Sequence, residues 1–229
     1  MDVKAQMERI YRDLPLDQIP WNIECPPRLL VDLVQSGRVP PCQAVDLGCG
    51  AGNYAVWLAT QGFEVTGLDL SAAAVALARE LARQKGVSCE FVVADVRGAT
   101  TVFDASFDFA YDWEVLHHVL PENRPGYVAN VHRMLRVGGR YLSVCFSEDD
   151  PGLAGEGKYR QTPLGTLLYL SSEQEMRDLF QPWFDLEALS TVEVEGKRGP
   201  HRAVSAWLRK KELKVRPGPG GLEMTIETS

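Results

Sequence analysis

The stretch VDLGCGAGN at residues 45–53 constrains the fold of this chain more than any other feature of its sequence. An apolar run ends in Asp46 and Leu47, glycines follow at every second position, and the helical-looking segment 54–61 comes next. Glycine lets the backbone turn sharply and lets a ligand approach it, while the start of the helix offers free N–H groups and a positive dipole end. The stretch therefore predicts a strand, a tight turn and a helix that together hold a nucleotide-like ligand.

The glycine pattern alone leaves two classes of ligand open. The dinucleotide fingerprint G-x-G-x-x-G has glycine at its sixth position, where this chain has Asn53. Asp69 closes the second expected strand, where a carboxylate can accept both hydroxyls of a ribose bound over the glycine loop. Asp95 closes the third, where an acid can accept the amino hydrogen of an adenine. This second acid favours S-adenosylmethionine over a dinucleotide.

Short apolar runs alternate with helical segments along most of the chain, as in a sheet that is covered on both faces. We expect strands at residues 44–47, 64–69, 90–95, 107–111 and 140–146. We expect helices at residues 53–60, 72–85 and 125–135, the second of them with Ser71 as its N-cap and Gly86 as its end. This order predicts right-handed crossovers and a parallel sheet.

The two ends of the chain differ from its middle. Residues 4–14 have helical apolar spacing, residues 15–27 are rich in proline, and a further helix is expected from Pro27 to Gln35. Glycine and charge over residues 147–165 predict a long loop, which is often a lid or a binding element. Beyond it we expect a helix with a capping box at 172–180, an antiparallel edge hairpin of strands 184–194 and 203–209, and a tail in which a Pro/Gly turn separates two short strands.

The length of 229 residues suits one α/β domain with a small cap. We divide the chain into an N-terminal helical cap or lid segment at residues 1–37, a cofactor-binding domain at 38–211 and a C-terminal tail at 212–229.

Charge and composition disfavour several classes of protein. The net charge is −7, from 24 basic and 31 acidic residues, so binding to nucleic acid is not expected. No apolar run approaches the roughly 20 residues that span a bilayer, and the first residues lack the apolar core of a signal peptide. The five cysteines contain no C-x-x-C, so neither a disulfide framework nor a metal site is indicated. We expect a cytoplasmic protein, monomeric or weakly dimeric, with no membrane partner.

These motifs together resemble the class I S-adenosylmethionine-dependent methyltransferases. The matching pieces, which cover residues 44–146, are VDLGCGAGN, VTGLDLS, FVVADV, FDFAYDWEVLHHV and MLRVGGRYLSVCF. PWNIECPP, YDWEVLHH and the spacing of Arg124 and Tyr127 are most similar to small-molecule methyltransferases of the thiopurine, thiol and tellurite type. The resemblance implies an α/β fold, a Rossmann-like three-layer sandwich with a seven-stranded, mostly parallel sheet whose last strand is antiparallel.

The resemblance also implies roles for individual residues toward S-adenosylmethionine and its product S-adenosylhomocysteine. Gly48 and Gly50 lie against the methionine part, and Asp46 contacts its ammonium group. Asp69 holds the ribose and Asp95 the adenine. The complete set assigned to the cofactor is Trp21, Asp46, Gly48, Cys49, Gly50, Asn53, Asp69, Leu70, Asp95, Val96 and Asp112.

Three residues after the fourth strand are the candidate catalytic residues: Asp112, Trp113 and His117. The resemblance puts the first two near the methyl group. A histidine titrates near neutral pH, so His117 or His118 is a candidate base. The alternative is that both are packed helix residues, because adjacent helical positions do not face one ligand.

Other residues near the motifs keep two interpretations each. Trp21 covers the sulfonium with its aromatic face, or it anchors the core beside the prolines. Cys49 lies inside the glycine loop, where a small buried filler is a better interpretation than a nucleophile. The basic turn EGKRGPHR at residues 195–202 attracts an anionic substrate, or it is a solvated hairpin tip.

Two functions follow from this sequence. The first is transfer of a methyl group from S-adenosylmethionine to a small-molecule nucleophile, a thiol or another heteroatom, by in-line displacement. The second is a non-catalytic sensor or scaffold that binds the same cofactor, because a fold and a ligand do not fix the chemistry. For the first, we expect the acceptor pocket to lie between Trp21, residues 112–118 and the loop 147–165.

Overall fold

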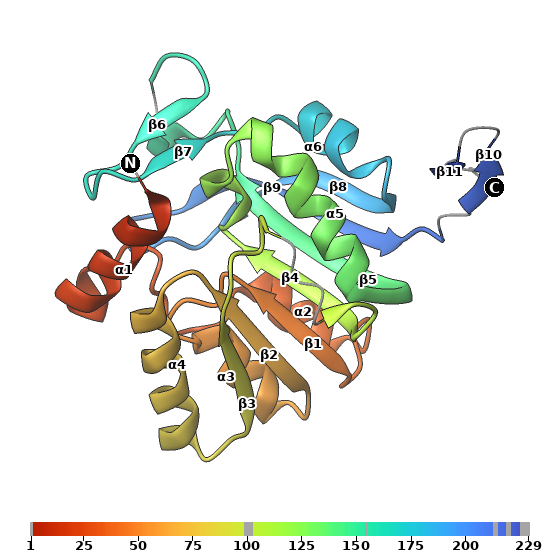
Figure 1. Ribbon diagram of the computed structural model, residues 1–229. Helices are drawn as coiled ribbons and strands as arrows, with labels where there is room; N and C mark the ends of the chain where they lie inside the picture. The colour runs from red at the N-terminus through yellow and green to blue at the C-terminus, as the bar shows by residue number, and fades with distance from the viewer. Residues whose placement is uncertain (1, 99–102, 154, 213–214, 219–220, 225–229) are drawn as a thin grey trace.

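The computed structural model describes residues 2–98, 103–153, 155–212, 215–218 and 221–224. Its main sheet has seven strands in the order β3-β2-β1-β4-β5-β9-β8 (Figure 1). These are β1 (Gln43–Leu47), β2 (Glu64–Asp69), β3 (Cys89–Val93), β4 (Phe107–Trp113), β5 (Leu135–Phe146), β8 (Phe184–Val194) and β9 (His201–Lys210). Strands β1 to β5 pair in parallel, while β9 runs antiparallel to both β5 and β8. The expected mostly parallel sheet with an antiparallel last strand is confirmed.

Helices cover both faces of the sheet and complete three layers. On one face, α2 (Arg28–Gln35), α3 (Asn53–Thr60) and α4 (Ala72–Lys85) bury their apolar residues against the sheet in one cluster. On the other face, α5 (Arg124–Met134) and α6 (Glu173–Phe180) form a second cluster. Strand β1 contributes Ala44 to the first cluster and Val45 to the second, because successive side chains of a strand point to opposite faces.

Local signals in the sequence set the ends of two helices as expected. The Ser71 side chain accepts the N–H of Ala74 at the start of α4, and Gly86 ends this helix in the left-handed conformation. Ser172 and Glu175 form a capping box at the start of α6. Both arrangements satisfy backbone groups that a helix end leaves without partners.

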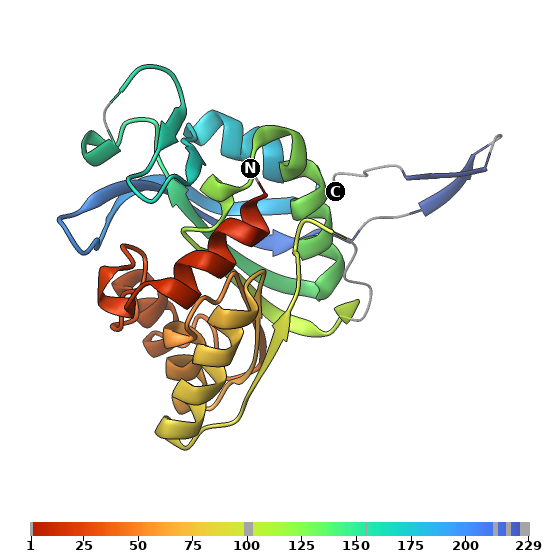
Figure 2. The ribbon, with the colours of Figure 1, turned by 60° about the vertical axis from the view of Figure 1, so that its left-hand side comes forward.

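The N-terminal segment is pinned to the domain, as the sequence predicts. Helix α1 (Val3–Asp13) lies beside α4 (Figure 2), and a short 3-10 helix, η1 (Leu16–Gln18), follows it. Ile10, Tyr11 and Ile19 are buried against Ala51 of the glycine loop and Ala74 of α4. Because this packing lies at the carboxyl ends of β1 and β2, the segment forms part of the binding face.

Several boundaries differ from the sequence prediction. Strand β3 ends at Val93, so Asp95 lies in the loop beyond it, and β4 continues to Trp113 rather than ending at residue 111. The loop 147–165 is not without structure, because it holds a 3-10 turn, η5 (Pro151–Leu153), and the strand β6 (Tyr159–Gln161), which pairs with β7 (Leu167–Tyr169). Two further 3-10 turns, η3 (Leu116–His118) and η4 (Pro121–Asn123), connect β4 to α5.

The tail holds the two expected short strands, β10 (Val215–Gly218) and β11 (Gly221–Met224), paired antiparallel. The turn between them, residues 219–220, lies outside the described residues. Among the residues that the structure describes, no helix has the length and apolar character needed to cross a membrane.

A substitution at Gly52 tests the close packing between the glycine loop and α4. A Cβ at Gly52 would lie 2.7 Å from Cβ of Ala78, and φ is +83°. We expect Gly52→Ala to lower the free energy of unfolding by about 2 to 5 kcal/mol, from overpacking and left-handed strain together. Gly86→Ala is the control, because Gly86 has φ +67° and open space around it, so only the strain applies. Urea unfolding in which Gly52→Ala costs no more than Gly86→Ala would contradict this packing.

Candidate functional site

The glycine loop between β1 and α3 is closely covered on both sides. A Cβ at Gly48 would lie 2.6 Å from Cγ2 of Val115, and one at Gly50 would lie 2.5 Å from the Tyr11 hydroxyl. Both glycines have positive φ. Since Val115 follows β4 and Tyr11 belongs to α1, glycine is required here by contacts with two distant parts of the chain.

The N–H groups of the glycine loop are mostly bonded within the protein. The N–H groups of Gly48 and Cys49 donate to the Leu68 carbonyl at 2.7 and 2.9 Å. The Gly50 N–H donates to Oδ2 of Asp69 at 2.8 Å. A loop that binds pyrophosphate leaves such groups for its ligand. The pattern therefore disfavours a dinucleotide, in agreement with Asn53 at the sixth position.

Two buried carboxylates lie beside this loop. Asp69 accepts the Gly50 N–H with one oxygen and the Ser71 N–H, at 2.9 Å, with the other. Asp46 is only 4% exposed, and burial raises its pKa to about 7, with the charges of Asp69 and Asp112 adding to the shift. A cationic ligand group beside Asp46 would favour its charged form.

The far end of the groove is an apolar slot with a polar rim. Its apolar lining includes Leu70, Ala94, Val96 and Val119. At the rim, Arg97 forms a two-point ion pair with Asp95, with N–O distances of 2.9 and 2.8 Å. This pairing is the main cause that holds the pKa of Asp95 below its usual value. Such a slot suits a flat, largely apolar ring with polar edges.

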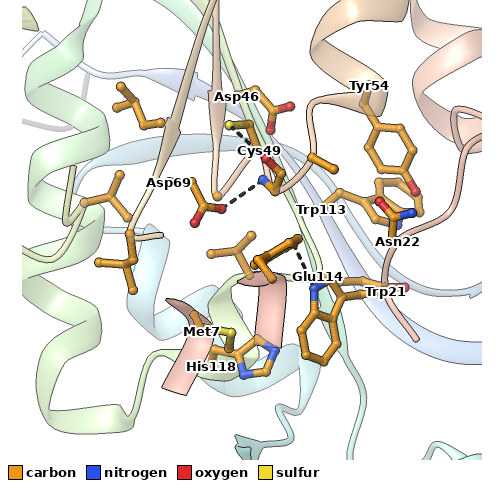
Figure 3. A pocket seen from close by; sticks show the side chains of 18 of the residues that line it. Met7, Trp21, Asn22, Asp46, Cys49, Tyr54, Asp69, Trp113, Glu114 and His118 are labelled. Atoms are coloured by element: carbon orange, nitrogen blue, oxygen red, sulfur yellow. Dashed lines mark hydrogen bonds between the residues drawn. The ribbon is translucent and has the colours of Figure 1, made fainter. Parts of the chain in front are cut away.

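All residues assigned to the cofactor from the sequence, apart from Asp112, line this one cavity. Figure 3 shows Trp21, Asp46, Cys49 and Asp69 around it. Cys49 is buried with its pKa raised well above the usual value by burial, which fits the filler interpretation. Asn53 also ties down the N-terminal segment, because its side-chain amide donates to Asn22 and to the Ile23 carbonyl at 3.0 and 3.2 Å.

The expected position of Asp112 near the methyl group is wrong. Asp112 is fully buried, accepts a hydrogen bond from the Tyr141 hydroxyl and lines neither of the cavities described here. Strand β4 extends through this position, so Asp112 faces the α5 side while Trp113, next along the strand, faces the cavity. Burial raises the pKa of Asp112 to about 6.

A second cavity adjoins the first and is larger, about 370 Å³ against about 130 Å³. The three segments expected around an acceptor pocket all line it, through residues that include Trp21, His117 and Leu164. The hairpin turn between β8 and β9, with residues 196–201, closes another side. Trp21, Ile23, Glu114 and His118 line both cavities, so the two spaces meet there.

The basic turn is largely exposed, as expected of a hairpin tip, but Lys197 is held by the N-terminal segment. Nζ of Lys197 donates to the carbonyls of Leu16, Asp17 and Ile19 at 3.0, 3.0 and 2.7 Å. Lys197 therefore uses its three hydrogens to hold the N-terminal segment over the second cavity. His201, from the same turn, bonds through Nδ1 to Oδ2 of the buried Asp150 at 2.7 Å.

His117 is placed to donate a hydrogen bond from Nε2 rather than to accept a proton. It is buried, lines only the second cavity and stacks on Phe146 with the ring centroids 4.3 Å apart. The Phe146 N–H points to its Nδ1 at 3.4 Å, so the neutral ring carries its hydrogen on Nε2. Burial also holds the pKa of His117 well below its usual value. This geometry speaks against His117 as a base.

Glu114 is a site residue that the sequence reasoning missed. It follows β4 directly, has φ +62° and donates its N–H to the Val144 carbonyl at 2.8 Å. A left-handed conformation costs a residue other than glycine roughly 1 to 2 kcal/mol and often marks a functional site. Its Oε1 is shut off from solvent and has no hydrogen-bond partner among the described residues. The signal in the sequence was an acid at the carboxyl end of a strand, in YDWE.

Comparison with known proteins agrees with this geometry. Residues 44–139 match a family described as a methyltransferase domain. A 2-heptyl-1-hydroxyquinolin-4(1H)-one methyltransferase from Mycobacteroides abscessus is 29% identical, and the match covers 84% of this chain and 82% of that protein. The probable S-adenosyl-L-methionine-dependent methyltransferase TehB from Haemophilus influenzae is 25% identical, with 79% of this chain and 62% of that protein covered.

Solved structures share the fold. A structure described for the conversion of a disulfide bond into a thioacetal group during echinomycin biosynthesis has a TM-score of 0.77 and 25% identity, covering 91% of this chain and 92% of that one. The 1,6-didemethyltoxoflavin-N1-methyltransferase from Burkholderia thailandensis, solved with 1,6-didemethyltoxoflavin and S-adenosylhomocysteine, has a TM-score of 0.67 and 21% identity, covering 92% and 88%.

The raised pKa of Asp46 predicts a pH dependence of stability. Between its ordinary pKa of 3.8 and about 7, the folded carboxyl keeps a proton that the unfolded chain has released. Stability is therefore lost as pH rises through this range, by roughly 1 kcal/mol between pH 6 and pH 8 from this group alone. Asp46→Asn, which cannot ionise, should show a smaller fall than wild type in urea unfolding of the ligand-free protein. Equal falls in both proteins would contradict the assignment.

Proposed function

Because this chain is an S-adenosylmethionine-dependent methyltransferase by its domain match and its relatives, we propose that it methylates a heteroatom of a small organic molecule by in-line displacement. The observation that carries the proposal is the shared wall of Trp21, Ile23, Glu114 and His118 between the two cavities. A cofactor in the first cavity and an acceptor in the second would meet at this wall.

The residues of the first cavity fit the cofactor. The apolar slot with Leu70, Val96 and the rim carboxylate of Asp95 suits the adenine, and Asp69 suits the ribose hydroxyls. Asp46 suits the ammonium group, and Gly48 and Gly50 line the cavity beside it without side chains. When bound, the cofactor supplies a methyl group on a positively charged sulfur, which a nucleophile attacks.

The N-terminal segment covers the meeting point. Nε1 of Trp21 donates to the Tyr11 hydroxyl at 2.9 Å, which fixes the indole ring against α1. The aromatic face of Trp21 is then available to a cation, and its bulk excludes water from the reacting atoms. Lys197 holds the same segment at residues 16–19, and Asn53 holds it at residues 22–23.

The walls of the second cavity support an organic acceptor. Pro20, Phe146, Leu153, Pro163, Leu164 and Leu168 make it largely apolar. Its size lies near the lower end of the range for small-molecule pockets. The relative from Mycobacteroides abscessus is named for a heteroaromatic acceptor. We propose that catalysis arises mainly from aligning the acceptor with the methyl group in a space that excludes water.

The cofactor assignment is tested by Asp69→Ala. This variant removes a buried acceptor of charge-assisted hydrogen bonds, each of which contributes about 1.5 to 3 kcal/mol. We expect the dissociation constant of S-adenosylhomocysteine, measured by calorimetry, to rise at least about tenfold. Asp95→Ala is the comparison, with a smaller loss expected because Arg97 already engages that carboxylate. Unchanged affinity in Asp69→Ala would place the ribose elsewhere.

The methyl-transfer proposal is tested by turnover. Wild-type protein is incubated with S-adenosylmethionine and a panel of phenols, heteroaromatic N–H compounds, thiols, amines and chalcogen oxyanions. We expect S-adenosylhomocysteine to form in an acceptor-dependent way. If the protein binds the cofactor but no acceptor yields product, the sensor or scaffold role replaces the enzyme.

A further inference from the structure

Glu114 is the only acid among the residues of the described chain that line both cavities. Figure 3 shows it on the same side of the first cavity as Trp21 and Trp113. Its backbone is held in the left-handed region by the hydrogen bond to Val144, directly after β4. A glutamate in a conformation that glycine adopts more readily indicates that its side chain is needed at this place.

The carboxylate of Glu114 has no cationic partner among the residues that the structure describes. Its Oε1 is shut off from solvent and unbonded, and the nearby charges of Asp150 and Glu195 repel it. The neighbouring cation, Lys197, is occupied by three backbone carbonyls. The carboxylate is half-buried, and the Trp113 side chain favours its charged form, while its Oε1 is left without a hydrogen-bond partner that a ligand hydrogen would supply.

Resting on the proposed methyl transfer, we propose that Glu114 is the catalytic base and that the acceptor attacks through an O–H or N–H group of a weakly acidic, planar ring. The acceptor O–H or N–H bond breaks and its proton passes to Glu114. The lone pair of the heteroatom forms the bond to the methyl carbon. The carbon–sulfur bond breaks, and its electron pair remains on sulfur. The positive charge of the sulfonium and the negative charge of Glu114 are both removed in this step.

The charge of Glu114 also sets the class of acceptor. A proton-free anion such as thiocyanate has nothing to give to a base, and an unpaired carboxylate at the meeting point repels it. The wall of the second cavity offers aromatic surface to a planar ring, because Phe146 stacks with His117 at 4.3 Å and packs in a tilted arrangement against His201 at 4.8 Å.

The histidines near Glu114 are less suited to accept this proton. His118 lines both cavities, but burial lowers its pKa to about 4. His117 carries its hydrogen on Nε2, as its contact with Phe146 requires. His201 lines only the second cavity, where Asp150 holds its Nδ1. Burial and the neighbouring acids raise the pKa of Glu114 to about 8 in the ligand-free protein, and a bound sulfonium would lower it again.

The test compares Glu114→Gln with wild type and with Glu122→Gln, the same change at an exposed position. With an O–H or N–H acceptor from the turnover panel, we expect the kcat of Glu114→Gln to fall at least about 100-fold. The wild-type rate should rise with pH on the acidic side of its profile, and this rise should be absent in Glu114→Gln. Binding of S-adenosylhomocysteine, measured by calorimetry, should stay within about threefold in all three proteins. Glu114→Asp, which keeps a carboxylate, should retain the pH-dependent limb at a lower rate.

A second readout does not depend on turnover. 4-Nitrophenol is titrated with each protein in the presence of a non-reactive analogue of S-adenosylmethionine that carries an ammonium group in place of the sulfonium, and the phenolate absorbance is recorded. Wild type and Glu122→Gln should generate phenolate below the pH at which the free phenol ionises, and Glu114→Gln should not.

Two results overturn the proposal: equal phenolate absorbance with wild type and Glu114→Gln, or turnover of Glu114→Gln within threefold of wild type. Faster methylation of thiocyanate than of any O–H or N–H acceptor also overturns it. Absence of turnover with every acceptor counts against the proposed function, while the phenolate readout still decides the role of Glu114.

Discussion

The carboxylate of Asp69 connects the parts of the site, because it accepts backbone N–H groups from loops that follow two different strands. Gly50 comes after β1 and Ser71 after β2, and each donates to one oxygen. The loop between β1 and α3 is thereby held at the carboxyl edge of the sheet, where ligands of open α/β sheets bind. Tyr11 and Val115 pack against the glycines of this loop. The walls of the cofactor cavity therefore depend on the two hydrogen bonds that Asp69 accepts.

Local physical signals were enough to predict residues that the structure brings together around one cavity. Gly48 and Gly50 are needed where other chain segments come within contact, and an acid such as Asp69 at the carboxyl end of a strand can accept ribose hydroxyls. The same signals did not place Asp112. The face to which a strand residue points depends on where the strand ends and on its register. Strand β4 continues to Trp113, two residues beyond the end that its apolar pattern predicts.

The acceptor half depended on contacts between segments far apart in the sequence. A lysine in a basic turn is usually solvated, yet Lys197 holds carbonyls of residues that precede it by about 180 positions. Glu114 has a positive φ that is set by the bond to Val144 and by the turn into η3, and no propensity of the residue itself predicts it. Such features arise from tertiary structure and become visible only when the strands are assembled.

Methyl transfer between the two cavities requires the reacting sulfur to lie where they meet, beside the carboxylate of Glu114 and the aromatic face of Trp21. A crystal structure with bound S-adenosylhomocysteine measures this directly. We expect the ribose hydroxyls to bond to Asp69 and the sulfur to lie within about 4.5 Å of Trp21, Ile23, Glu114 or His118. A sulfur atom distant from all four residues, or a ribose away from Asp69, would contradict it.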